Sequence, residues 1–129
     1  MNIYFLIAAI ISLFTCIAHL TFGHKQFVKP MQQAQFEPAA KAAMHCVFHY
    51  VSVFLVLATM VLFACGLMLV PAMQSYSLVL FIALNFILFA IWQIYIGYFS
   101  DIAGAFRSLF QWFFFLLISG FILFGTFSR

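Results

Sequence analysis

The fold is decided by residues 42–100, AAMHCVFHYVSVFLVLATMVLFACGLMLVPAMQSYSLVLFIALNFILFAIWQIYIGYFS, which contain no Asp, Glu, Lys or Arg. About 20 apolar residues cross a bilayer as a helix, so this stretch has room for two spans. Residues 1–24 and 108–128 are also free of these charged residues, and each has room for one more span. The sequence therefore predicts an all-α, polytopic membrane protein built as a bundle of four transmembrane helices.

The composition of the whole chain excludes two other classes of protein. Hydrophobic residues make up 68% of the 129 residues and charged residues only 5%, whereas a soluble domain carries roughly 25% charged residues. Disorder requires low hydrophobicity and many charges, which is the opposite pattern. The net charge of +3 comes from scattered cations that form no basic patch, so we expect a lipid bilayer as partner and no nucleic acid.

Glycine and proline positions predict where the helices begin and end. The expected spans are about 3–22, 43–70, 77–99 and 108–127. Gly23 suits the residue after a helix end, Pro38 suits the first residue of the next helix, and Pro71 should end that helix. Because the connections are short, sequential helices should be antiparallel and should form a single domain over residues 1–129.

Positive charges predict the orientation of the bundle. Loops on the cytoplasmic side are enriched in Lys and Arg. The first connection holds Lys25, Lys29 and Lys41 and the third holds Arg107, whereas residues 71–76 hold no cation. We therefore expect both termini to lie outside the cell.

All four histidines flank the first connection. His45 and His49 are four residues apart and share a face of the second helix, and antiparallel packing should bring His19 to a similar depth. Neutral imidazole is the commonest metal ligand, so these three residues predict a cytoplasm-facing cofactor site. The alternative is that they only donate hydrogen bonds to carbonyls and headgroups. His24 is expected to be solvated.

Two kinds of cofactor fit this cluster. A b-type haem would take His19 and either His45 or His49 as axial ligands. A Cu, Fe or Zn ion would use all three histidines, with Asp101 or water completing the shell; Asp101 could otherwise form a surface ion pair. The ion is favoured because the facing surfaces of the first two helices carry small side chains, which leave little space for a porphyrin.

Further polar residues extend this region along the helices. The stripe on the second helix runs His45, His49, Ser52, Val56, Thr59, Phe63 and Gly66, and we expect it to pack on Ala8, Ser12, Cys16 and His19 of the first helix. Ser52, Gln93 and Gln111 should support the ligands. The two glutamines could orient ligands or bind a quinone carbonyl, or form interhelical hydrogen bonds. The three cysteines lie apart without C-x-x-C spacing, so we expect them to serve in packing.

The residues that carry a resemblance are His19, Gly23, Pro30, His45 and His49. Their spacing, an H-x3-G segment and a proline-bearing loop followed by H-x3-H, resembles that of small bacterial four-helix inner-membrane proteins of unassigned function. The likeness covers residues 19–49 and the four-span layout. In those proteins the residue before the last histidine tends to be tryptophan, where this chain has Phe48. The resemblance implies a bacterial inner membrane and no particular activity.

Three functions remain open on the sequence alone. The first is redox chemistry or metal handling at the histidine cluster. The second is a non-enzymatic accessory or scaffold role, as a homo-oligomer or within a larger membrane complex, which 20 phenylalanines and short loops would suit. The third is transport, although no Asp or Glu lies within a span to carry protons. No hydrolase arrangement of Ser, His and Asp or of paired carboxylates is present, and whether the chain is an enzyme stays open.

Overall fold

Every regular element of the computed structural model, which describes residues 1–128, is a helix. The elements are α1 (Ile3–Ala18), η1 (His19–Val28), α2 (Lys29–Gln33), α3 (Pro38–Gly66), α4 (Ala72–Phe99), α5 (Ala105–Ser108) and α6 (Gln111–Phe127). The element η1 is a π-helix that continues α1 and leads into α2, so the three form one unbroken helix. The all-α prediction is confirmed.

Three of these helices are long and apolar enough to cross a membrane. They are Ile3–Gln33, Pro38–Gly66 and Ala72–Phe99, each with a mean hydropathy of 2.3 over its best window. The helix α6 is also apolar but has 17 residues. At 1.5 Å per residue it is about 26 Å long, slightly shorter than the hydrocarbon core of a bilayer.

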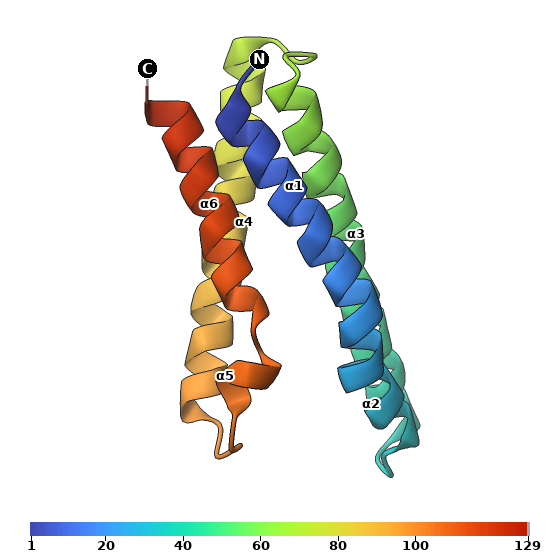
Figure 1. Ribbon diagram of the computed structural model, residues 1–129. Coiled ribbons are helices and arrows are strands. Elements are labelled where there is room, and N and C mark those ends of the chain that lie inside the picture. Colours follow the sequence, from blue (N-terminus) through green and yellow to red (C-terminus); the bar gives the residue numbers. More distant parts are fainter. Residues whose placement is uncertain (129) are drawn as a thin grey trace.

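The helices form two antiparallel pairs (Figure 1). In one pair α1 packs along α3, and in the other α4 packs along α6. Because α1 also packs on α6, the pairs are joined at the end that carries both termini. Toward the other end, where α2 and α5 lie, the two pairs diverge.

The first helix does not end at Gly23, as the sequence predicted, but continues through it as η1. Glycine is needed at this position for packing and not for chain reversal. A Cβ atom on Gly23 would lie 3.0 Å from Cε2 of Phe48. The absence of a side chain therefore lets the Phe48 ring of α3 lie directly against the backbone of η1.

The remaining helix ends agree only in part with the prediction. Pro38 is the first residue of α3, as expected. The helix ends at Gly66 and not at Val70, and the chain then turns through Met68 in the left-handed region, with φ +59°. After Pro71, α4 begins about one turn earlier than expected, and the short helix α5 delays the start of α6 from 108 to 111.

Asn2 connects the ends of three helices. Its Oδ1 accepts hydrogen bonds from the backbone N–H groups of Tyr4 (3.1 Å) and Phe5 (3.3 Å), which caps α1. Its Nδ2 donates to the carbonyl oxygen of Gly125 in α6 (3.0 Å). Its backbone N–H donates to the carbonyl oxygen of Gly66 in α3 (2.9 Å). One residue thus satisfies backbone groups that helix ends otherwise leave without partners.

Two consecutive side chains of α1 lie against glycines of its neighbours. A Cβ on Gly125 would lie 2.8 Å from Cε1 of Phe5, and a Cβ on Gly66 would lie 2.7 Å from Cδ2 of Leu6. Lipid gives apolar helices no hydrophobic reason to associate, so close packing at small residues must supply the attraction. These two contacts hold α6 and α3 against two neighbouring faces of α1, about 100° apart around the helix.

We predict that Gly125→Ala destabilises the protein, because the new methyl group would push Phe5 away and overpack the α1–α6 contact. The expected cost is about 1–3 kcal/mol. Gly120→Ala is the matched control in the same helix, since a Cβ there meets no atom within 4 Å. Thermal unfolding in detergent micelles measures both variants. Equal unfolding temperatures for the two would contradict the tight α1–α6 contact.

Candidate functional site

A cavity of about 570 Å³ lies between the two helix pairs where they diverge. Small-molecule sites in proteins are typically about 300–1,000 Å³. The walls come from the start of η1 and from α3, α4 and α6, with one residue from the chain before α6. They are apolar and aromatic except for His19, Gln93 and Gln111. The cavity therefore combines an apolar volume with three polar groups.

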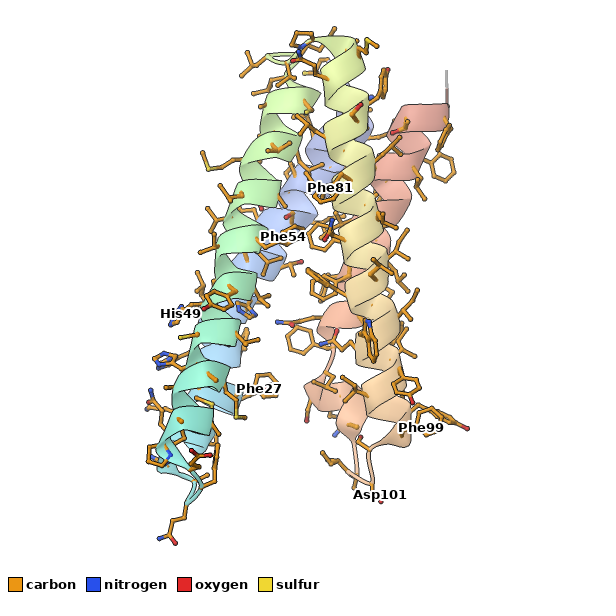
Figure 2. The ribbon with its side chains drawn as sticks, turned by 180° about the vertical axis from the view of Figure 1, so that it is seen from behind. Phe27, His49, Phe54, Phe81, Phe99 and Asp101 are labelled. Carbon is orange, nitrogen blue, oxygen red and sulfur yellow. The ribbon has the colours of Figure 1, made fainter. Side chains whose placement is uncertain are left out.

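Four phenylalanine rings pack together beside the cavity, on the side of the chain termini. Phe54 of α3 lies 5.5 Å from Phe86 and 5.2 Å from Phe89 of α4, measured between ring centroids. Phe115 of α6 lies 5.4 Å from Phe86 and 5.9 Å from Phe89. Figure 2 shows Phe54 between α3 and α4. These rings close the space between the pairs at this level and limit the cavity to the diverging end.

His19 is buried, with 6% of its surface exposed, at the junction of α1 and η1. Its Nε2 lies 3.1 Å from the carbonyl oxygen of Phe48, and its Nδ1 lies 3.3 Å from Nε2 of Gln111. A carbonyl oxygen only accepts, so Nε2 of His19 carries the hydrogen and Nδ1 accepts from the amide of Gln111. Both nitrogens of the imidazole are thus engaged by other helices.

The ring of Phe48 packs flat against the imidazole ring of His19. The two rings stack with centroids 4.2 Å apart and planes inclined by 17°. Ser52, one turn along α3, donates to the same Phe48 carbonyl oxygen at 3.0 Å. This oxygen therefore lies within hydrogen-bond distance of both the His19 ring and the Ser52 hydroxyl. Ser52 was predicted to support the histidines; it shares this acceptor with His19, and its supporting role stays a prediction.

Gln93 of α4 lines the cavity and carries a buried side-chain oxygen, Oε1, without a hydrogen bond from residues 1–128. Leaving a buried polar atom unpaired costs about 1–3 kcal/mol. A molecule in the cavity that donated a hydrogen bond to this amide would remove the cost.

His45 and His49 lie on another flank of α3 and do not line the cavity. Their Nε2 atoms are 3.1 Å apart, so one imidazole donates to the other. Figure 2 shows His49 on the side of α3 that faces away from α4. The predicted pairing of these two residues on one face is therefore confirmed.

The face of α3 that packs on α1 is rotated from the predicted stripe. Ser52, Thr59 and Gly66 are buried as expected, and Oγ of Ser12 lies 2.7 Å from Oγ1 of Thr59. Val56, however, is 43% exposed, and the exposed His49 lies on the same side. The stripe was wrong at these positions because the contact face runs through Phe48 and Ser52, beside the histidines.

The structure places the other predicted ligands as follows. Within residues 1–128, no three His, Cys, Asp or Glu side chains are grouped as a metal ion would require. Asp101 is exposed in the connection after α4, and His24 is exposed on η1, as expected. The histidines His19, His45 and His49 are not grouped as a metal ion would require, and a metal or haem site at these residues stays a prediction. Phe48 and Trp92, which line the cavity, were not predicted, because an aromatic residue in an apolar helix carries no distinct signal.

Comparison with known proteins found no match to the chain among protein-family models, curated proteins or solved structures. The resemblance of residues 19–49 to small bacterial inner-membrane proteins thus stays a prediction. Two residues of that pattern, His19 and Gly23, nevertheless lie in contact with the same ring, that of Phe48.

We predict that Gln111→Leu destabilises the protein by about 1–2 kcal/mol, because Nδ1 of His19 would lose its donor while remaining buried. Gln74→Leu makes the same chemical change at an exposed position of α4 and serves as the control. Thermal unfolding in micelles compares the two. If Gln111→Leu unfolds at the same temperature as Gln74→Leu, the His19–Gln111 hydrogen bond does not contribute to stability.

Proposed function

We propose that this protein is an integral membrane protein that binds a small lipid-soluble molecule of the quinone or quinol class in the cavity between its helix pairs. One observation carries the proposal: the buried Oε1 of Gln93, which has no hydrogen-bond partner within residues 1–128, belongs to the wall of an apolar, aromatic-lined cavity of about 570 Å³. An apolar cavity with few polar groups is the usual form of a small-molecule site.

The walls of the cavity suit a flat ring. Phe48, Phe89, Trp92 and Phe115 all line it, and aromatic rings prefer stacked or edge-to-face contacts with one another. His19 and Gln111 are already bonded to each other, which leaves Gln93 to recognise the headgroup. Rotation of its terminal amide group presents either the oxygen, which accepts from a quinol hydroxyl, or the NH₂ group, which donates to a quinone carbonyl. Both redox forms of one molecule would thus be bound.

The route into the cavity would lead from the lipid. Met44, Val47 and Ile96 line the cavity and are each about half exposed. They are apolar, so a lipid-soluble tail could lie along them while the ring enters. The site would then draw its ligand from the bilayer and not from the aqueous phase.

We further propose that α6 is the fourth span and that both termini lie outside the bacterial inner membrane. Lys25, Lys29, Lys41 and Arg107 all belong to the diverging end of the bundle or its connections, and an excess of Lys and Arg favours the cytoplasmic side. In this orientation the cavity opens in the cytoplasmic half of the bilayer.

A protein with one such site needs a partner to pass electrons or ligand onward, so we propose a homo-oligomer or a larger membrane complex. The proposal thus combines a redox role with that of a subunit in a larger assembly. A metal ion or haem at His19, His45 and His49, with Asp101, remains the alternative proposal. Either cofactor would break one of the two hydrogen bonds of His19. The ion is favoured over haem because the small side chains on the facing surfaces of α1 and α3 leave little space for a porphyrin.

The test is quenching of Trp92 fluorescence by a short-chain benzoquinone in detergent. A Trp112→Phe background leaves Trp92 as the single tryptophan, because the chain has two. We expect saturable quenching, and Gln93→Leu should weaken binding about tenfold, which corresponds to about 1.4 kcal/mol for the lost hydrogen bond. Gln74→Leu is the matched control and should bind as the background does.

A second variant, Val51→Phe, adds a ring to the cavity wall and should also reduce binding, because it fills the space. The quinone dissolves equally in the micelles of every variant, so only a specific site can distinguish them. Quenching that rises without saturation, or that neither Gln93→Leu nor Val51→Phe reduces, would refute the proposed quinone site.

A further inference from the structure

His45 and His49 differ from His19 in what their nitrogens face. The two nitrogens of His19 bond to the backbone of Phe48 and the side chain of Gln111. In contrast, the Nε2 atoms of His45 and His49 face one another across 3.1 Å, and the two ring centroids are 4.9 Å apart. These two nitrogens are therefore already directed toward one small region of space.

The separation of these nitrogens fits a shared metal ion. Imidazole nitrogens bind Zn²⁺ at about 2.0–2.1 Å. Two such nitrogens on one ion lie about 2.9–3.4 Å apart for coordination angles from square-planar to tetrahedral. The observed 3.1 Å lies within this range. An ion could replace the hydrogen between the rings if both imidazoles turned their Nε2 lone pairs toward it.

The surroundings of the pair leave room for an ion. His49 is exposed and His45 half-buried. Lys41, one turn before His45 on α3, has its ammonium group bound to the carbonyl oxygen of Gln32 at 3.0 Å, and this group lies 5.6 Å from the centroid of Phe36. The nearest cation along the helix is thus engaged by the first connection.

We propose that His45 and His49 form an open site for a divalent d-block ion, Zn²⁺, Ni²⁺ or Cu²⁺, on the outer flank of α3. Imidazole suits these ions and not Mg²⁺ or Ca²⁺, which prefer oxygen. Within residues 1–128 no third His, Cys, Asp or Glu joins the pair. The ion keeps coordination positions for water, and such an open site exchanges its ion, unlike a closed four-ligand structural site.

This site is separate from the proposed quinone site, because neither histidine lines the cavity. It also replaces the predicted three-histidine arrangement with a two-histidine one. The two arrangements make different demands on His19, which allows an experiment to separate them.

The experiment is Zn²⁺ titration of the purified full chain, produced without a histidine tag, in detergent against a zinc indicator dye. We expect one ion per chain. His49→Gln and His45→Gln should each weaken binding by at least about tenfold, the lower end of the effect of disturbing even an outer group around a metal, because each variant removes one of the two ligands. His24→Gln, at an exposed position of η1, is the matched control and should bind normally. Cu²⁺ bound to the unmodified chain should show hyperfine coupling to two nitrogens.

Three results would overturn the proposal. The first is binding that survives in both His45→Gln and His49→Gln. The second is equal loss in His24→Gln, which would mean nonspecific binding by any histidine. The third is equal loss in a folded His19→Gln variant, which would support the three-histidine site. Thermal unfolding of each variant without metal shows that it is folded, and the exposure of His49 leads us to expect an unchanged unfolding temperature.

Discussion

The contact of α1 with α6 is the constraint on which the rest of the structure depends. Phe5 fits against Gly125, and Asn2 bonds to the carbonyl of the same glycine. Since α1 also packs along α3, this contact joins one helix pair to the other at the terminal end of the bundle. Toward the opposite end the pairs diverge, and there the hydrogen bond between His19 and Gln111 links them beside the cavity. The cavity lies where the close helix contact of the terminal end has opened.

Most buried polar side chains of residues 1–128 form hydrogen bonds inside the apolar interior, and this distinguishes them from the candidate ligand-binding group of Gln93. Lipid offers no water to a buried donor or acceptor, so each should find a protein partner. Ser12 pairs with Thr59, and Ser119 donates to the carbonyl oxygen of Ala83. His19 is bonded at both nitrogens. Against this background, the unpaired Oε1 of Gln93 requires a specific explanation.

Charge distribution predicted the helical class and the three long apolar helices, because charged residues are excluded from spans whatever their neighbours are. The hydroxyl pairing of Ser12 and Thr59 was also foreseeable from their place on small-residue faces. The rotation of α3 was not. Phe48, His49 and Ser52 lie within about 100° of one another around a helix, so periodicity alone cannot decide which of them faces α1. That decision depends on the fit of the Phe48 ring against Gly23, a tertiary contact between residues far apart in the chain.

The hydrogen bond from Asn2 to Gly125 joins residues 123 positions apart. During insertion into a membrane, α1 therefore leaves the ribosome well before its partner α6. The α1–α3 and α4–α6 hairpins can each form from segments near one another in the chain, whereas their junction must wait for α6. Until α6 is made, α1 has only its contacts with α3, and the Phe5 and Asn2 contacts with Gly125 close the bundle afterwards.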